Sequence, residues 1–118
     1  MIRKKADLST KLEPNLKGGR GTVKILNILE QEEIFGLGRL FALSCIPPGA
    51  SIGRHKHEGD FETYYILKGR ALVNDNGNTA ELGPGDMMQC RDGDFHSIEN
   101  AGNEDLEYLA VILYTKEK

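Results

Sequence analysis

The chain has 118 residues, a length that predicts one domain with a small hydrophobic core. Its formal net charge of -3 argues against a nucleic-acid-binding protein, which would carry a basic patch or stripe. No apolar run approaches the roughly 20 residues that span a bilayer, and no apolar stretch follows the charged start MIRKK. We therefore expect neither a membrane span nor a secretory signal, and we expect a cytoplasmic location.

The first 22 residues show no hydrophobic periodicity and end close to the sequence Gly-Gly-Arg-Gly. We predict an N-terminal arm at residues 1–22, followed by a single barrel domain at residues 23–118. The arm either docks on a partner subunit or is a loosely ordered terminus. Its basic cluster, Arg3 to Lys5, is expected to be solvated.

Beyond the arm, short apolar segments alternate with turns that are rich in glycine, proline and asparagine, at a spacing of about ten residues. This pattern is typical of an all-β sandwich or barrel. The last predicted strand is the longest and the most apolar, so it should lie at the centre of a sheet. We expect a single helical turn at Glu30–Ile34. The predicted strands are Val23–Leu29, Arg39–Ile46, Ser51–His57, Phe61–Leu67, Ala71–Val73, Thr79–Leu82, Met87–Cys90, His96–Glu99 and Leu106–Tyr114.

Two turns have a specific stereochemical prediction. In the segment 83–86, Pro84 presets its own φ and Gly85 can adopt a positive φ, as a type II turn requires. The segment 74–78 contains Gly77 and predicts a hairpin loop. The two cysteines, Cys45 and Cys90, are too few for a disulfide framework and are expected to be reduced and packed near the core, although a thiol that lines a pocket is an alternative.

All three histidines fall within one spaced pattern with a glutamate. His55 and His57 are two residues apart, so a strand would point both imidazoles to one face. Glu62 follows a tight reversal, and His96 comes from a later hairpin. Imidazole is the commonest protein ligand for transition metals, and a carboxylate completes a four-ligand set. The alternative is that 54–58 is a polar surface strand and His96 a solvated histidine.

The spacing around these residues resembles two motifs of the cupin superfamily. The first is Gly49-x5-His55-x-His57-x4-Glu62-x6-Gly69, and the second is Gly85-x5-Arg91-x-Gly93-x2-His96-x3-Asn100. The family usually has proline where this chain has Arg91, which leaves the shape of one turn open. The glycines at 49, 69, 85 and 93, and Asn100, are interpreted as turn residues.

The resemblance implies an all-β double-stranded β-helix, the jelly-roll barrel of the cupins. It also implies that His55, His57, Glu62 and His96 bind a divalent metal with an open coordination position. Manganese or iron(II) is the expected physiological metal, and a purified sample could carry zinc or nickel because affinity rises along the series from manganese to copper. A homodimer is expected as well.

For function, we expect a small metalloenzyme that acts on a polar metabolite, with dioxygenase, decarboxylase, isomerase or lyase chemistry. Tyr64 is the candidate catalytic residue, since strand alternation points it inward with Glu62; Ile66 and Ile98 should also point inward, and Gln89 and Arg91 could reach the cavity. Packing alone explains each of these as well. The alternatives are a non-catalytic, metal-bearing protein that binds a carboxylate or sugar, and a structural barrel with a vestigial site.

Overall fold

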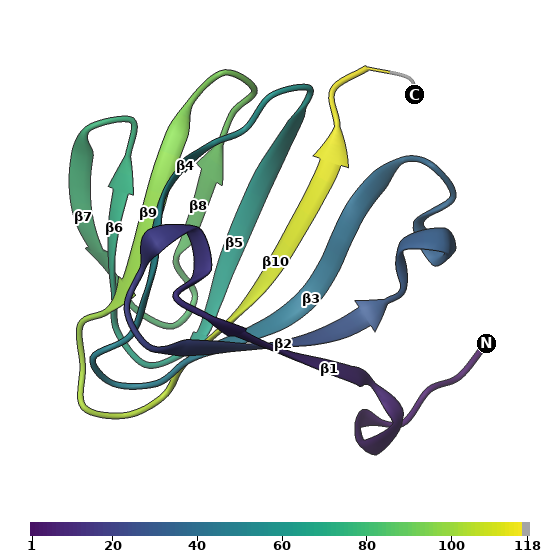
Figure 1. Cartoon of the computed structure of the whole chain (residues 1–118), viewed down its shortest axis with the longest axis horizontal. Coiled ribbons are helices and arrows are strands. Elements are labelled where there is room, and N and C mark those ends of the chain that lie inside the picture. Colours follow the sequence, from purple (N-terminus) through teal and green to yellow (C-terminus); the bar gives the residue numbers. More distant parts are fainter. Residues whose placement is uncertain (117–118) are drawn as a thin grey trace.

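The computed structural model describes residues 1–116, which form two antiparallel sheets packed face to face (Figure 1). One sheet has six strands in the order β1-β2-β3-β10-β5-β8, and the other has four in the order β4-β9-β6-β7. The elements are η1 (Lys5–Asp7), β1 (Ser9–Pro14), η2 (Leu16–Gly18), β2 (Thr22–Leu29), η3 (Gln31–Ile34), β3 (Gly38–Ile46), β4 (Ser51–Lys56), β5 (Asp60–Lys68), β6 (Ala71–Asp75), β7 (Asn78–Leu82), β8 (Met87–Cys90), β9 (Phe95–Asn100) and β10 (Leu106–Tyr114).

The predicted all-β jelly-roll barrel is confirmed, and each of the nine predicted strands is present. Strand β10 lies between β3 and β5, as expected for the most apolar strand. Its alternate residues, from Leu106 to Ile112, are buried on the inner face, because successive side chains of a strand point to opposite faces. Ile66 of β5 and Ile98 of β9 are buried in the same core, so the predicted inward alternation of these strands is confirmed.

Residues 1–22 extend the barrel. Strand β1 pairs antiparallel with β2, from Ser9 opposite Asn27 to Pro14 opposite Thr22, and forms the edge of the six-stranded sheet. The chain then crosses to the other sheet, where η2 packs against β4 (Figure 1). Strand β1 is not among the predicted strands, because it is exposed along almost its whole length and buries no apolar stripe that a sequence pattern could reveal.

The basic cluster is partly anchored, which corrects the prediction that it is solvated. The Arg3 guanidinium donates two hydrogen bonds to the Glu33 carboxylate, of 3.0 and 2.7 Å, and one of 3.1 Å to the Ile28 carbonyl. The predicted helical turn is the short 3₁₀ helix η3, whose start is fixed by a capping box between Glu30 and Glu33. The N-terminus is therefore held against this turn.

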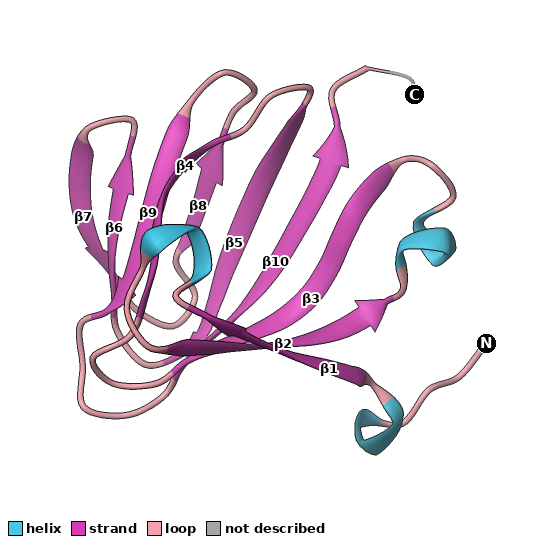
Figure 2. Ribbon diagram, in the orientation of Figure 1, coloured by secondary structure: helices cyan, strands magenta, loops and turns pink. Residues whose placement is uncertain are grey.

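The helices of the described chain are few and short, as Figure 2 shows, and none within residues 1–116 has the length and apolar character to cross a membrane.

The predicted turns have the expected backbone. Gly85 has φ of 90°, and the turn is closed by a 3.0 Å hydrogen bond from the Asp86 amide to the Gly83 carbonyl. In the hairpin between β6 and β7, Asn76 and Gly77 both have positive φ, which is the requirement of a type I′ turn. At the position of the unusual Arg91, the turn is closed by the Asp94 amide, 3.0 Å from the Arg91 carbonyl.

Candidate metal centre and cavity

Four side chains from both sheets converge between the layers. His55 lies on β4, His57 directly follows β4, Glu62 lies on β5, and His96 lies on β9. We call these four residues the His-Glu cluster. The predicted strand reaches His57, whereas β4 ends one residue earlier, at Lys56. His55 pairs with His96 across the β4–β9 ladder after a register shift. All four predicted ligands are therefore together, and only His55 is less than fully buried.

The donor atoms of the cluster are spaced as neighbouring ligands of one ion would be. Nε2 of His96 lies 3.0 Å from Nε2 of His55 and 3.1 Å from Nε2 of His57. Oε1 of Glu62 is 3.1 Å from Nε2 of His57 and from Nε2 of His96, and 3.9 Å from Nε2 of His55. Two ligands at about 2.1 Å from a metal and at a right angle are about 3.0 Å apart. The spacing thus fits a transition metal.

Hydrogen bonds on the other side of two imidazoles fix which ring nitrogen faces the cluster. Nδ1 of His55 is 2.8 Å from the Gly53 carbonyl, and Nδ1 of His57 is 2.7 Å from Oδ1 of Asp60. Because a carbonyl and an ionised carboxylate only accept hydrogen bonds, we infer that each Nδ1 carries the proton in the neutral ring. Both Nε2 atoms then direct a lone pair into the cluster. Converging lone pairs repel each other, and a bound cation removes that repulsion.

The carboxylates of the site are ionised. Burial opposes the charge of Glu62, but the three neighbouring imidazoles outweigh it and hold the Glu62 pKa well below its ordinary value. Burial likewise opposes the charge of Asp60, and Arg39 and His57 outweigh it, so the Asp60 pKa is lowered. For His57, burial disfavours the charged ring, but Glu62 and Asp60 raise the pKa. Burial dominates at His96 and lowers its pKa. Negative charge is therefore already in place for a cation.

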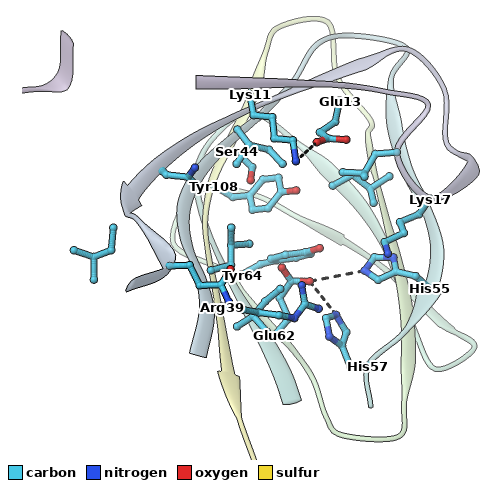
Figure 3. Close-up of a pocket in the computed structure, with 18 residues that line it drawn as sticks. Lys11, Glu13, Lys17, Arg39, Ser44, His55, His57, Glu62, Tyr64 and Tyr108 are labelled. Atoms are coloured by element: carbon cyan, nitrogen blue, oxygen red, sulfur yellow. Dashed lines mark hydrogen bonds and ion pairs between the residues drawn. The ribbon is translucent and has the colours of Figure 1, made fainter. Parts of the chain in front are cut away.

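The His-Glu cluster borders a cavity of about 470 Å³ (Figure 3). Three of the four cluster residues line it, together with Tyr64, which stacks on the His96 ring at 5.1 Å between centroids. Ser44 of β3 and Tyr108 of β10 also line it, on the same six-stranded sheet as Tyr64. Basic side chains also line the cavity: Lys11, Lys17 and Arg39. Lys11 pairs with Glu13 at 2.9 Å, and Arg39 pairs with Asp60 at 2.9 Å.

Two predicted pocket residues lie elsewhere. Gln89 and Arg91 are exposed and border a separate surface depression with Asp75 and Asn76. In place of Gln89 and Arg91, four residues of the N-terminal arm line the cavity: Lys11, Glu13, Leu16 and Lys17. No local signal marks them, because their position depends on the crossing of the arm from one sheet to the other. Within the described chain, both cysteines are unpaired, with Cys90 buried and Cys45 partly exposed.

Comparisons with known proteins find one family and two relatives that the chain resembles. The model of the cupin domain family matches residues 42–112. An oxalate-binding protein of Thermotoga maritima is 43% identical over 96% of this chain and 93% of its own length. An uncharacterized protein of Methanocaldococcus jannaschii is 35% identical over 63% of this chain and 59% of its own length.

Solved structures with a similar fold are found as well. A crystal structure from Thermotoga maritima, described as a predicted oxalate decarboxylase, has a TM-score of 0.92 and 43% identity, and the match covers 97% of this chain and 99% of that one. A Thermus thermophilus structure has a TM-score of 0.73 at 22% identity, with 96% of both chains covered, and shows the shared fold alone.

Proposed function

The chain belongs to the cupin family, and from this premise we propose that it holds a divalent transition metal at the His-Glu cluster and binds a small carboxylate there. One observation carries the proposal: three imidazole nitrogens and a carboxylate oxygen converge at the border of an open cavity. Four protein ligands leave positions on an octahedral ion for a chelating ligand. The protein holds the ligand set in place through Asp60 and the Gly53 carbonyl.

Family resemblance favours manganese or iron(II) in this site, with zinc or nickel as substitutes acquired on purification. A bound metal would polarise the carboxylate that chelates it. The chain itself supplies orientation. Burial, and to a smaller extent the negative charge of Glu62, raise the Tyr64 pKa well above its ordinary value. Tyr64 therefore stays protonated and can donate a hydrogen bond to a ligand oxygen.

A carboxylate is favoured by two features. The relative that matches almost the whole chain at 43% identity is named an oxalate-binding protein. The cavity wall also contains the basic side chain of Lys17, which favours an anion, whereas Lys11 and Arg39 already pair with Glu13 and Asp60. We infer that oxalate, or an acid that chelates a metal in the same way, is the ligand class.

A second candidate is a metalloenzyme, for which the similar structure described as a predicted oxalate decarboxylase is the specific support. Proton transfer at the metal would fall to Tyr64 in this case. Within the described chain, the acidic residues that line the cavity are Glu13, which pairs with Lys11, and Glu62, a cluster member. The protonated state of Tyr64 suits hydrogen-bond donation better than general-base catalysis, so binding is the first proposal.

The test uses protein depleted of metal and reloaded with manganese, or with iron(II) under nitrogen. Titration calorimetry with oxalate should show binding by the loaded protein and none by the metal-free protein. Oxalate recovered unchanged after long incubation supports a binding protein, and release of formate and carbon dioxide supports the second candidate. Stoichiometric metal without oxalate binding or turnover would overturn both. We also propose that the protein is a homodimer and that it is cytoplasmic.

A further inference from the structure

The cavity wall contains a cation whose charge the protein leaves unpaired. Two of the three basic residues that line the cavity, Lys11 and Arg39, pair with carboxylates at 2.9 Å. The third, Lys17, makes no ion pair with any of residues 1–116. Lys17 is exposed as well as part of the cavity lining, so a ligand in the cavity has access to its ammonium group.

The backbone of Lys17 has a conformation that lysine rarely adopts. Its φ is 55° and its ψ is 30°, within η2. In this left-handed region the Cβ of an L-residue comes close to a carbonyl oxygen, and glycine and asparagine tolerate it best. Packing gives little in return, because Lys17 is exposed. Backbone outliers of this kind cluster at ligand sites, so this one favours a role for the side chain in binding.

Two glycines hold the Lys17 backbone beside the His-Glu cluster. A Cβ on Gly53 of β4 would collide with the Lys17 carbonyl oxygen, and a Cβ on Gly19 would collide with the Ser51 carbonyl oxygen. The arm and β4 therefore pack backbone against backbone, as only glycine allows. The Gly53 carbonyl oxygen also lies 2.8 Å from Nδ1 of His55. One residue of β4 thus contacts both Lys17 and a member of the cluster.

The Lys17 side chain and the cluster face the same ligand space. In Figure 3, the Lys17 side chain extends toward His55, and both residues line the cavity. Oxalate consists of two directly bonded carboxylates. When one oxygen of each carboxylate binds a metal ion, the other two oxygens point away from the ion and keep negative charge. A second cation on the cavity wall is suited to bind these free oxygens.

We propose that Lys17 is a specificity residue, whose ammonium group binds the carboxylate oxygens that the metal leaves free. The inference rests on the proposed function, because it assumes that a carboxylate chelates the metal. The N-terminal arm is then part of the ligand site and not only an extension of the sheet. The ligand class is a carboxylate that keeps uncoordinated oxygens when it chelates, as oxalate does.

The experiment compares wild type with Lys17→Gln, Lys17→Arg and Lys5→Gln, all loaded with manganese. Lys5→Gln is the matched control, because it removes the same charge from an exposed lysine of the arm that does not line the cavity. The calorimetric probes are oxalate and acetohydroxamate. Acetohydroxamate chelates with both of its oxygens and leaves none for Lys17. Manganese affinity is measured by competition with a fluorescent chelator.

We expect Lys17→Gln to bind oxalate about tenfold more weakly than wild type, since a hydrogen bond to a charged group is lost. Lys17→Arg should keep most of the affinity, and Lys5→Gln should match wild type. Acetohydroxamate and manganese should bind equally well to all four proteins. Added salt should narrow the difference in oxalate affinity between wild type and Lys17→Gln, because it screens the charge.

Lys17→Asn separates binding from stability. Asparagine is uncharged and tolerates a positive φ better than lysine. The metal-free Lys17→Asn protein should therefore unfold at no lower temperature than wild type, while the loaded protein binds oxalate as weakly as Lys17→Gln. A lower unfolding temperature together with weaker binding would show that Lys17 supports the fold of the arm, and would overturn the inference.

The failure of this inference is distinguishable from the failure of the proposed function. Oxalate affinity that is unchanged in Lys17→Gln, or an equal loss of acetohydroxamate affinity, would overturn the role of Lys17 alone. Loaded wild type that fails to bind oxalate would overturn the proposed function and this inference with it.

Discussion

Asp60 is the residue that links His57 to the rest of the barrel. Its Oδ1 accepts the hydrogen bond from His57, and its Oδ2 lies 2.9 Å from Nε of Arg39. A carboxylate in this position orients an imidazole and makes its other nitrogen a better ligand. We expect Asp60→Asn to weaken manganese affinity by about 10- to 100-fold, measured by competition with a fluorescent chelator. Glu58→Gln, at an exposed neighbouring position, should match wild type, and unchanged affinity in Asp60→Asn would contradict this role.

Cys90 should be an inert thiol. It is fully buried, and burial, with smaller effects of Asp94 and Asp75, raises its pKa to about 12. Because the thiolate is the reactive form, only roughly one in 10⁵ of these groups is ionised at pH 7. We expect iodoacetamide to label Cys90 in the native protein far more slowly than in urea, as measured by mass spectrometry of the two cysteine peptides. Equal rates in both conditions would show that Cys90 is accessible.

At the scale of elements, the ion pair between Arg3 and Glu33 holds the N-terminus against η3. The hydrogen bond from Arg3 lowers the Glu33 pKa, so its stabilising effect is present above the ordinary carboxylate pKa and is lost as the pH falls through the lowered value. Glu33→Gln should therefore have a slightly lower Tm than wild type at pH 7, and the difference should shrink as the pH falls below the ordinary carboxylate pKa. Differential scanning calorimetry over a series of acidic pH values measures this, and a difference that grows on acidification would contradict the electrostatic origin.

The sequence predicts those elements whose structure depends on residues that are close together in the chain. The alternation of Leu106–Tyr114 and the turn at 83–86 depend on residues that are adjacent in sequence, and the structure agrees with both. Strand β1 has no such cause. Its backbone pairs with β2, but Leu12 is 64% exposed, so no apolar period marks the strand. Edge strands that bury little are therefore found only once the fold is known.

The same distinction holds for the site. His55 and His57 are two residues apart, and the motif spacing adds Glu62 and His96, so a pattern in the chain predicts the cluster that the fold brings together. The other residues that line the cavity depend on tertiary structure. Tyr108 looks like any inward residue of a central strand, and Lys17 looks like any lysine of a segment without hydrophobic periodicity. Metal ligands are predictable here, and ligand specificity is not.

At the scale of the whole molecule, apolar side chains are exposed where the arm meets the η3–β3 connection. Phe35 is 84% exposed and Leu37 is 69% exposed, and Arg3 ties the N-terminus to this region. Exposed apolar patches mark interaction sites in soluble proteins. We expect sedimentation equilibrium to give twice the 13.1 kDa mass of one chain. The variant Phe35→Asn/Leu37→Ser, in which asparagine tolerates the positive φ at position 35, should dissociate more readily. A monomer for wild type at high concentration would contradict the homodimer.

Metal removal should lower the stability of the whole barrel, because the His-Glu cluster joins both sheets. A ligand at 100 times its Kd stabilises the folded state by about 2.7 kcal/mol. For a domain of this size, that corresponds to roughly a 10 °C higher Tm for the manganese-loaded protein than for the metal-free protein. Glu62→Gln, which removes a ligand charge, should show a much smaller difference in thermal unfolding.

The stabilisation by metal should also depend on pH, with a sign set by His57. Its pKa is raised in the metal-free protein, so protonation of His57 stabilises that form below the ordinary imidazole pKa, and this contribution is lost as the pH rises through the raised value. A metal requires the neutral ring and must displace that proton. The Tm difference between loaded and metal-free protein should therefore be largest near pH 8 and shrink toward pH 5. A difference that grows as the pH falls would mean that the metal binds without His57.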